Sequence, residues 1–295
     1  MGDVLFDRTV RVDVITSTGT VVGIRNLHIS FDVGLRSRGE PNDAVIRIYN
    51  LSPTTRNLLR EDGAAVRLFA GYAGKADKIF EGTIVTPVSN PDGPVDMVTE
   101  IISADGYREL DRSYFSRSYA AGTPIATILR DLVGTLGIPA VFDGLTGEKL
   151  LRGRTIEGKI PRVLSRLGGE YDFRWKVDFG TVYLGPRGVP DRNHPTAVLL
   201  NSETGLIGTP TVKFERFRGE TRRRVVARSL MNANLRPGRL VKIESTRFVV
   251  EADKRFRKSA DEVTPNGVFL IDEARFQGDN FGGDFDVEVT GYGNG

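Results

Sequence analysis

Only two histidines occur in this sequence, and histidine is the side chain most often used for acid–base chemistry near neutral pH. His28 lies in an alternating apolar segment, which predicts a structural role, and His194 lies in polar residues 192–195, which predicts a solvated ring. No residues have metal-ligand spacing, and the sequence contains no HExxH, GxSxG or SxxK motif. The 38 acidic residues show no pattern that selects a catalytic carboxylate pair. We therefore predict no catalytic residue, cofactor or metal, and no enzymatic activity.

Two glycine-rich segments are candidates for loops that bind phosphate or a cation. Neither GYAGKADKIFEG nor GDNFGGDFD matches the phosphate-binding patterns GxxxxGK[ST] and GxGxxG. Residues 278–284 combine carboxylates with glycines, so a cation loop is conceivable, although the spacing differs from that of a helix–loop–helix calcium loop. A hairpin turn is the favoured interpretation.

Two basic clusters remain as candidates for contact with a partner or a pore. The first is Arg222, Arg223 and Arg224, and the second is Lys254, Arg255, Arg257 and Lys258. They are either solvated charges or a surface facing a negative partner, such as DNA in a pore or an acidic subunit. The net charge of +3 does not by itself predict nucleic-acid binding. Residues 252–266 are polar and without periodicity, which predicts a long exposed loop.

The composition is that of a globular protein with two or three domains: 295 residues, 39% hydrophobic and 27% charged. The absence of cysteine excludes disulfides and thiol chemistry. The charged N-terminus lacks the apolar centre of a signal peptide, and no apolar run approaches the ~20 residues that span a bilayer. We therefore expect synthesis in a cytoplasm without export by a classical signal.

Short alternating segments must position these residues, and they predict a mainly β chain with an α+β insert. In residues 1–112 we expect a small antiparallel β-barrel, with Ser52 capping a helical turn at 54–59 and strands at 9–15, 20–33, 44–49, 65–72, 79–85 and 95–103. Residues 113–200 predict a helix–helix–hairpin module, with helices at 123–136 and 160–167, a turn at 155–158, and hairpin strands at 172–177 and 181–184. In residues 201–295 we expect a second β-barrel, with strands at 211–217, 222–229, 240–245, 247–251, 268–277 and 285–290.

Three runs, in this order, resemble the baseplate or tail hub proteins of tailed bacteriophages, a family that includes hubs of phage-like contractile particles and gene-transfer agents. The first is PNDAVIRIYNLSPTTRNLL with VRLFAGY and KIFEGTI, the second is SLMNANLRPGRLVKIES, and the third is VFLIDEARFQGDNFGGDFDVEVTGY. The resemblance covers nearly the whole chain. One departure is the segment 252–266, which is longer and more basic than a simple hairpin link.

The resemblance implies a structural virion protein, a homotrimeric ring whose two barrels per subunit give pseudo-sixfold symmetry. Such a ring adapts a sixfold tail tube to a threefold spike or fibre. It implies tail tube, tape-measure, spike and baseplate wedge proteins as partners, DNA passage through the channel, and assembly in the host cytoplasm. Two alternatives stay open: a tail-associated peptidoglycan-degrading enzyme and a DNA-contacting pore protein.

Overall fold

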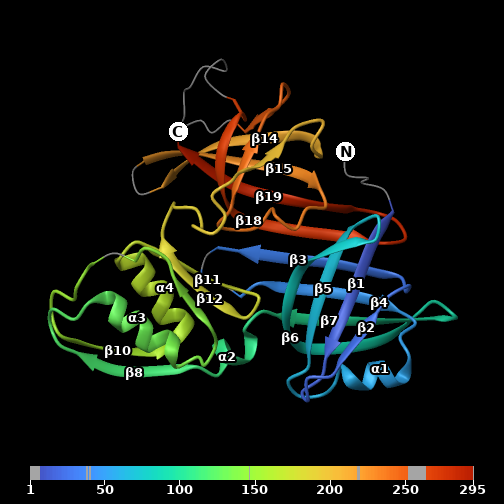
Figure 1. Ribbon diagram of the computed structural model, residues 1–295, viewed down its shortest axis with the longest axis horizontal. Coiled ribbons are helices and arrows are strands. Elements are labelled where there is room, and N and C mark those ends of the chain that lie inside the picture. Colours follow the sequence, from blue (N-terminus) through green and yellow to red (C-terminus); the bar gives the residue numbers. More distant parts are fainter. Residues whose placement is uncertain are drawn as a thin grey trace.

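The computed structural model describes residues 7–37, 39, 41–145, 147–217, 220–251 and 264–294, with residues 216, 217, 220, 221 and 294 described by their backbone alone. Strands dominate the fold, and a large sheet lies beside a smaller module that carries two of the helices (Figure 1). Within these residues the helices are α1 (Pro53–Leu58), α2 (Tyr107–Asp111), α3 (Ile125–Gly134) and α4 (Ile160–Glu170). The predicted mainly β class with a small helical part is confirmed. In the described part of the chain, no helix has the length and apolarity needed to cross a membrane.

Fourteen strands form the large sheet, seven from each end of the chain. The N-terminal strands are β1 (Arg8–Ile15), β2 (Val21–Ile24), β3 (Ile29–Arg36), β4 (Asp43–Tyr49), β5 (Ala65–Tyr72), β6 (Lys75–Asp92) and β7 (Asp96–Ala104). The C-terminal strands are β13 (Val198–Leu200), β14 (Leu206–Phe217), β15 (Glu220–Leu230), β16 (Leu240–Ile243), β17 (Val249–Glu251), β18 (Gly267–Asp279) and β19 (Phe285–Asn294). The main path through the sheet is β17-β14-β15-β19-β18-β3-β4-β7-β6-β5-β1-β2, with β16 pairing β18 and β13 beside it.

The two predicted barrels are not seen as closed units, because the described strand pairs trace one open path that ends at β2 and β17. Antiparallel pairing of β3 with β18, from Arg36↔Glu273 to Ser30↔Asp279, joins the two halves directly. One hydrophobic core therefore runs through both halves and includes Val33 from β3 and Phe276 from β18. The sequence pattern identified the strands, but it could not show that the halves share a sheet.

Local chemistry explains where the N-terminal strands begin and end. The prediction of one strand over residues 20–33 is wrong, because Asn26 has a left-handed backbone (φ 60°) and separates β2 from β3. The Asn280 side chain then accepts from the Ile29 N–H at 2.8 Å and donates to the Leu27 carbonyl at 2.8 Å. The predicted Ser52 cap is present, since its hydroxyl accepts from the Thr55 N–H at 3.1 Å.

The inserted module has its own strands and its own core. Its strands are β8 (Tyr114–Tyr119), β9 (Ala140–Phe142), β10 (Arg154–Lys159), β11 (Phe173–Asp178) and β12 (Thr181–Pro186). The turn predicted at residues 155–158 is wrong, because these residues belong to β10 and pair with β8. Helix α4 also runs past its predicted end, through Gly168 and Gly169 to Glu170. Gly168 allows a close approach there, because a Cβ at this position would lie 2.8 Å from the Phe173 carbonyl oxygen.

Candidate functional site at the junction of module and sheet

The first predicted basic cluster does not form one patch, because successive residues of a strand point to opposite faces. Arg222, Arg223 and Arg224 all lie on β15. The Arg223 guanidinium lies 4.8 Å from the Phe269 ring centroid and donates to the Thr264 carbonyl at 3.0 Å, and burial lowers the pKa of Arg223. Arg224 lies 3.6 Å from Glu215. The second cluster, Lys254, Arg255, Arg257 and Lys258, lies outside the described residues.

His28 and the predicted turn at 278–284 come together at one end of the sheet. The His28 ring stacks on Tyr49 with centroids 4.3 Å apart, and its Nε2 lies 2.9 Å from the Asp279 carboxylate. Burial alone would raise the pKa of Asp279, but the contact with His28 and the Phe281 N–H hold it below its ordinary value. The turn joins β18 to β19, as predicted. No group of His, Asp or Glu side chains in the described ranges is arranged to hold a metal.

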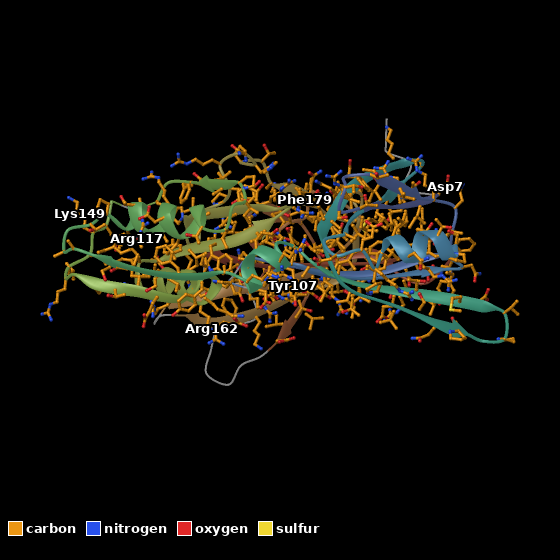
Figure 2. The ribbon with its side chains drawn as sticks, turned by 90° about the horizontal axis from the view of Figure 1, so that it is seen from below. Asp7, Tyr107, Arg117, Lys149, Arg162 and Phe179 are labelled. Carbon is orange, nitrogen blue, oxygen red and sulfur yellow. The ribbon has the colours of Figure 1, made fainter. Side chains whose placement is uncertain are left out.

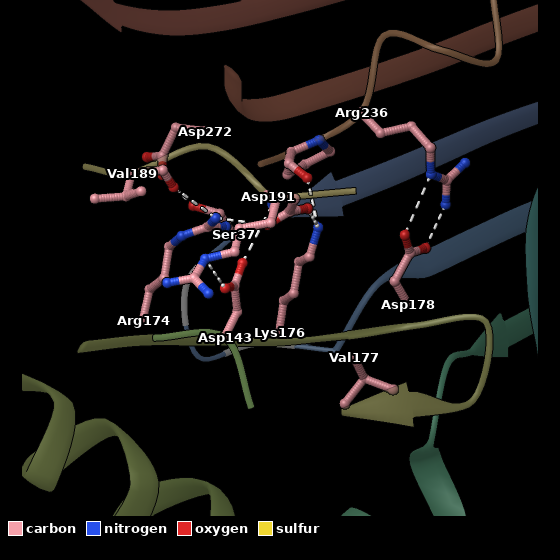
Figure 3. Close-up of polar contacts among 12 residues, drawn as sticks. Ser37, Asp143, Arg174, Lys176, Val177, Asp178, Val189, Asp191, Arg236 and Asp272 are labelled. Carbon is pink, nitrogen blue, oxygen red and sulfur yellow. Dashed lines mark hydrogen bonds and ion pairs between the residues drawn. The ribbon is translucent and has the colours of Figure 1, made fainter. Parts of the chain in front are cut away.

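A cluster of buried charge lies elsewhere, where the tip of the β11–β12 hairpin meets the sheet (Figure 3). Figure 2 places Phe179, at this tip, midway along the molecule between Lys149 at one end and Asp7 at the other. Hydrogen bonds join the sheet side to the hairpin backbone: the Asn42 amide donates to the Val177 carbonyl at 2.8 Å, the Gly39 N–H donates to the Trp175 carbonyl at 3.4 Å, and the Gly180 N–H donates to Asp105 at 2.9 Å.

Arg236, in the loop between β15 and β16, is the main sheet-side partner of the tip. It is 2% exposed, forms an ion pair with Asp178, and donates to the Ile79 carbonyl of β6 at 2.8 Å. The Phe179 ring lies between two cations, 4.2 Å from the Arg236 guanidinium and 4.0 Å from the Lys78 ammonium. These contacts fix both the charge and the ring of the hairpin tip on the sheet.

A second group of ion pairs is formed by Lys176 and Arg174, which precede Asp178 on β11 by two and four residues. Lys176 donates to Asp191 at 2.8 Å and to the Pro237 carbonyl at 2.6 Å, and Arg174 contacts the same carboxylate at 2.6 Å. The Asp191 N–H donates to the Gly238 carbonyl at 2.8 Å. Gly238 has φ 90°, and a Cβ on it would collide with the Asp191 carboxylate, so glycine is required here for two reasons.

Burial and paired charge set the protonation of this cluster. Burial alone would raise the pKa of Asp178, but the charges of Arg236 and Lys176 bring it below its ordinary value. Burial lowers the pKa of Lys176, and the charge of Asp191 opposes that change. No cation is among the main groups that shift the pKa of Asp105, and burial raises this pKa to about 7.

The sequence pattern did not reveal this junction. Lys176 and Asp178 lie in a hairpin whose strands were predicted, yet nothing in FRWKVD marks either side chain as buried. Their partners lie in later loops, Asp191 in the segment that follows the hairpin and Arg236 between β15 and β16. Arg236 lies in a run, LRPGR, that contributes only to the resemblance. The one available signal was the presence of three charges, Arg174, Lys176 and Asp178, on a strand that must pack on both faces.

Comparison with known proteins agrees with the resemblance at the level of the fold. No protein-family model and no curated protein matches the sequence. Among solved structures, the tail protein from Neisseria meningitidis MC58 superposes with a TM-score of 0.64 at 12% identity, covering 97% of both chains. The chain has a phage tail-protein fold.

Two further structures support this tail-protein fold. The 43 kDa tail protein of prophage MuSo2 from Shewanella oneidensis gives a TM-score of 0.63 at 9% identity, covering 97% of this chain and 98% of that one. The E. coli c3393 protein gives 0.57 at 12% identity, covering 90% of this chain and 72% of that one. It is described as a type VI secretion component similar to the T4 tail proteins gp27 and gp5. At these identities the likeness establishes the fold alone.

Proposed function

We propose that this chain is a structural hub of a phage tail baseplate or tail tip. The observation that carries the proposal is the match to two tail proteins over 97–98% of both partners, which leaves no large part of the chain for a separate activity. The three ordered sequence runs support it independently. In this role the protein acts by holding neighbours in fixed positions, and it is not an enzyme.

In the finer form of the proposal, three copies form a ring with pseudo-sixfold symmetry that adapts a tail tube to a spike or fibre. The equal contribution of seven strands from each end of the chain supports this form, because pseudo-sixfold symmetry needs two comparable parts per subunit. The boundaries at residues 112 and 200 belong to this proposal. Tube, tape-measure, spike and wedge proteins are the proposed partners, and the virion tail, assembled in the host cytoplasm, is the proposed location.

The ends of the sheet are candidate contacts between copies. Among the described strands, β2 pairs only with β1, and β17 pairs only with β14, so each exposes one backbone edge. Val21 on β2 is 51% exposed, and Val249 on β17 is also 51% exposed. Apolar open edges are natural sites for pairing with another chain, and two different edges give a head-to-tail contact that closes into a ring.

Native mass spectrometry of the purified chain, followed by electron microscopy, tests this function. We expect three copies per particle and a ring with a central channel. A chain that stays monomeric at all accessible concentrations and never enters tail particles would refute it. Clearing of a cell-wall zymogram would instead favour the enzyme alternative. Salt-sensitive gel-shift binding that is lost in an Arg222→Ala/Arg224→Ala variant would favour DNA contact.

A further inference from the structure

The module and the sheet have separate hydrophobic cores with no described residue in common. The sheet core draws on residues 10–101 and 200–289, and the module core draws on residues 110–184. Between the two cores, the β11–β12 hairpin makes hydrogen bonds, ion pairs and the cation contacts of Phe179. An interface of this kind resembles that between movable domains more than the interior of one domain.

The covalent links between module and sheet are two short crossings. The first follows β7, where Gly106 has a left-handed backbone (φ 64°) at the start of α2. The second is the segment between β12 and β13, which contains Gly188 with φ 76° and no helix or strand. Beyond Gly188 in the same segment, the Asp191 N–H is bound to the Gly238 carbonyl on the sheet side, so the pair of Lys176 with Asp191 ties the module to the sheet. Segments of this kind absorb backbone rotation without loss of helix or sheet hydrogen bonds.

Opening an ionic junction differs energetically from opening an apolar one. Buried ions lose their hydration, and their mutual attraction roughly compensates that loss, so water can replace the partners at small net cost. Removal of a single partner is different, because the remaining charge stays buried without compensation. The clasp formed by Arg236–Asp178 and Lys176–Asp191 is therefore tight when complete and releasable as a unit.

We propose that the α+β module is a hinged unit, held against the sheet by the Arg236–Asp178 and Lys176–Asp191 clasp and released when both pairs exchange for water while the two cores stay folded. The hairpin tip with Phe179 leaves its place between Lys78 and Arg236 on release. A neighbouring protein that contacts the module can displace it without disturbing the sheet, because the module and the sheet have no hydrophobic core residue in common. The proposal concerns the single chain and stands or falls apart from the trimeric ring.

Native-state hydrogen exchange at increasing urea tests the hinge on the unmodified chain. The reporters are the N–H groups of Gly180 and Asp191, whose acceptors are Asp105 and Gly238. The references are amides in α4 for the module core and in β3 and β18 for the sheet core. We expect the reporters to exchange at least about tenfold faster than either reference set, through an opening with a weaker urea dependence than global unfolding.

Two variants and a matched control complete the test. Asp178→Asn removes one charge of the clasp, and Gly238→Ala displaces Asp191. Asp32→Asn is the control, because it breaks the exposed Arg275–Asp32 pair on the sheet face. We expect both clasp variants, and not the control, to speed reporter exchange by a further tenfold or more, with the urea dependence of the reporters staying weaker than that of the core amides.

Reporters that exchange at the rate of the cores, with the same urea dependence in the unmodified chain, would show a single cooperative unit and overturn the proposal. The same conclusion follows if the clasp variants leave reporter exchange unchanged, or give it the urea dependence of global unfolding. Because the first measurement uses the unmodified chain, a variant that does not fold leaves the proposal testable. Trimer formation is measured separately, so its failure would not be confused with failure of the hinge.

Discussion

Replacement of Asp105 by asparagine should remove a pH dependence of stability that originates at the junction. Asp105 is 2% exposed and accepts from the Gly180 N–H at 2.9 Å. Burial is the main cause that raises its pKa to about 7, and the charges of Asp178 and Glu81 raise it further, while the N–H groups of Gly180 and Phe179 oppose the shift. The ordinary value is 3.8. The folded state therefore binds the Asp105 proton more tightly than the unfolded state.

The sign and size of the effect follow from linkage. A carboxyl with a raised folded pKa contributes its full stability below pH 3.8, and this contribution is lost progressively as pH rises to about 7. A shift of about three units corresponds to about 4 kcal/mol in total, of which about 2.5 kcal/mol is lost between pH 5 and pH 8. An asparagine side chain cannot ionise, so the Asp105→Asn variant should gain about 2.5 kcal/mol relative to the unmodified protein over that interval.

Urea unfolding monitored by tryptophan fluorescence measures this difference. The single tryptophan, Trp175, is buried on β11 beside the junction, so its signal reports on this region. Asp32→Asn is the control, because Asp32 has a lowered pKa, chiefly from its hydrogen bond with Arg275, and its linkage falls at pH values below this interval. If Asp105→Asn and the unmodified protein show parallel stability profiles from pH 5 to pH 8, Asp105 is ionised in the folded protein and the reasoning is wrong.

Three further predictions concern stability and use the same unfolding assay. Arg236→Met should lower the free energy of unfolding by about 3–5 kcal/mol, because Asp178 stays buried without its cation. Adding Asp178→Leu to this variant should recover most of the loss. Equal stability of Arg236→Met and the unmodified protein would contradict this prediction. Gly168→Ala should destabilise the protein, because the new Cβ would lie 2.8 Å from a backbone oxygen. Gly169→Ala, whose Cβ would have no atom within 4 Å, should stabilise the protein by about 0.5–1 kcal/mol. A change of the same sign in both variants would count against the packing argument. Ser52→Ala should cost about 1 kcal/mol through loss of the α1 cap, with Ser52→Thr as the conservative control.

Strands with one buried face were predictable from the sequence because their side chains alternate. β5 (Ala65–Tyr72) has the predicted bounds, and its buried residues alternate from Val66 to Ala70. β10 was missed because only Ile156 of its six residues is buried, so no alternation is visible. β6 was predicted to end at residue 85, but it continues to Asp92. Beyond Thr83 it pairs with β7 alone, so Pro87 and Pro91 lie where one backbone edge has no strand partner and proline is tolerated.

The junction could not be predicted for a different reason. Its ion pairs join Asp178 with Arg236, 58 residues later, and Lys176 with Asp191, 15 residues later, and no periodicity relates them. A charge on a strand is ordinarily solvated, so sequence alone places Lys176 in water. Its burial depends on two covering segments, the one after β12 that carries Asp191 and the β15–β16 loop that carries Pro237.

The position of the module in the chain gives the junction its consequence. The chain leaves the sheet after β7 and returns at β13, while the two halves of the sheet pair directly through β3 and β18. The module therefore adds no strand to the large sheet, and its displacement changes no strand register there. If the sheet forms the ring, as proposed, the module can respond to a neighbour while the ring keeps its geometry. An apolar junction of similar extent would merge the two cores and couple every movement of the module to the sheet.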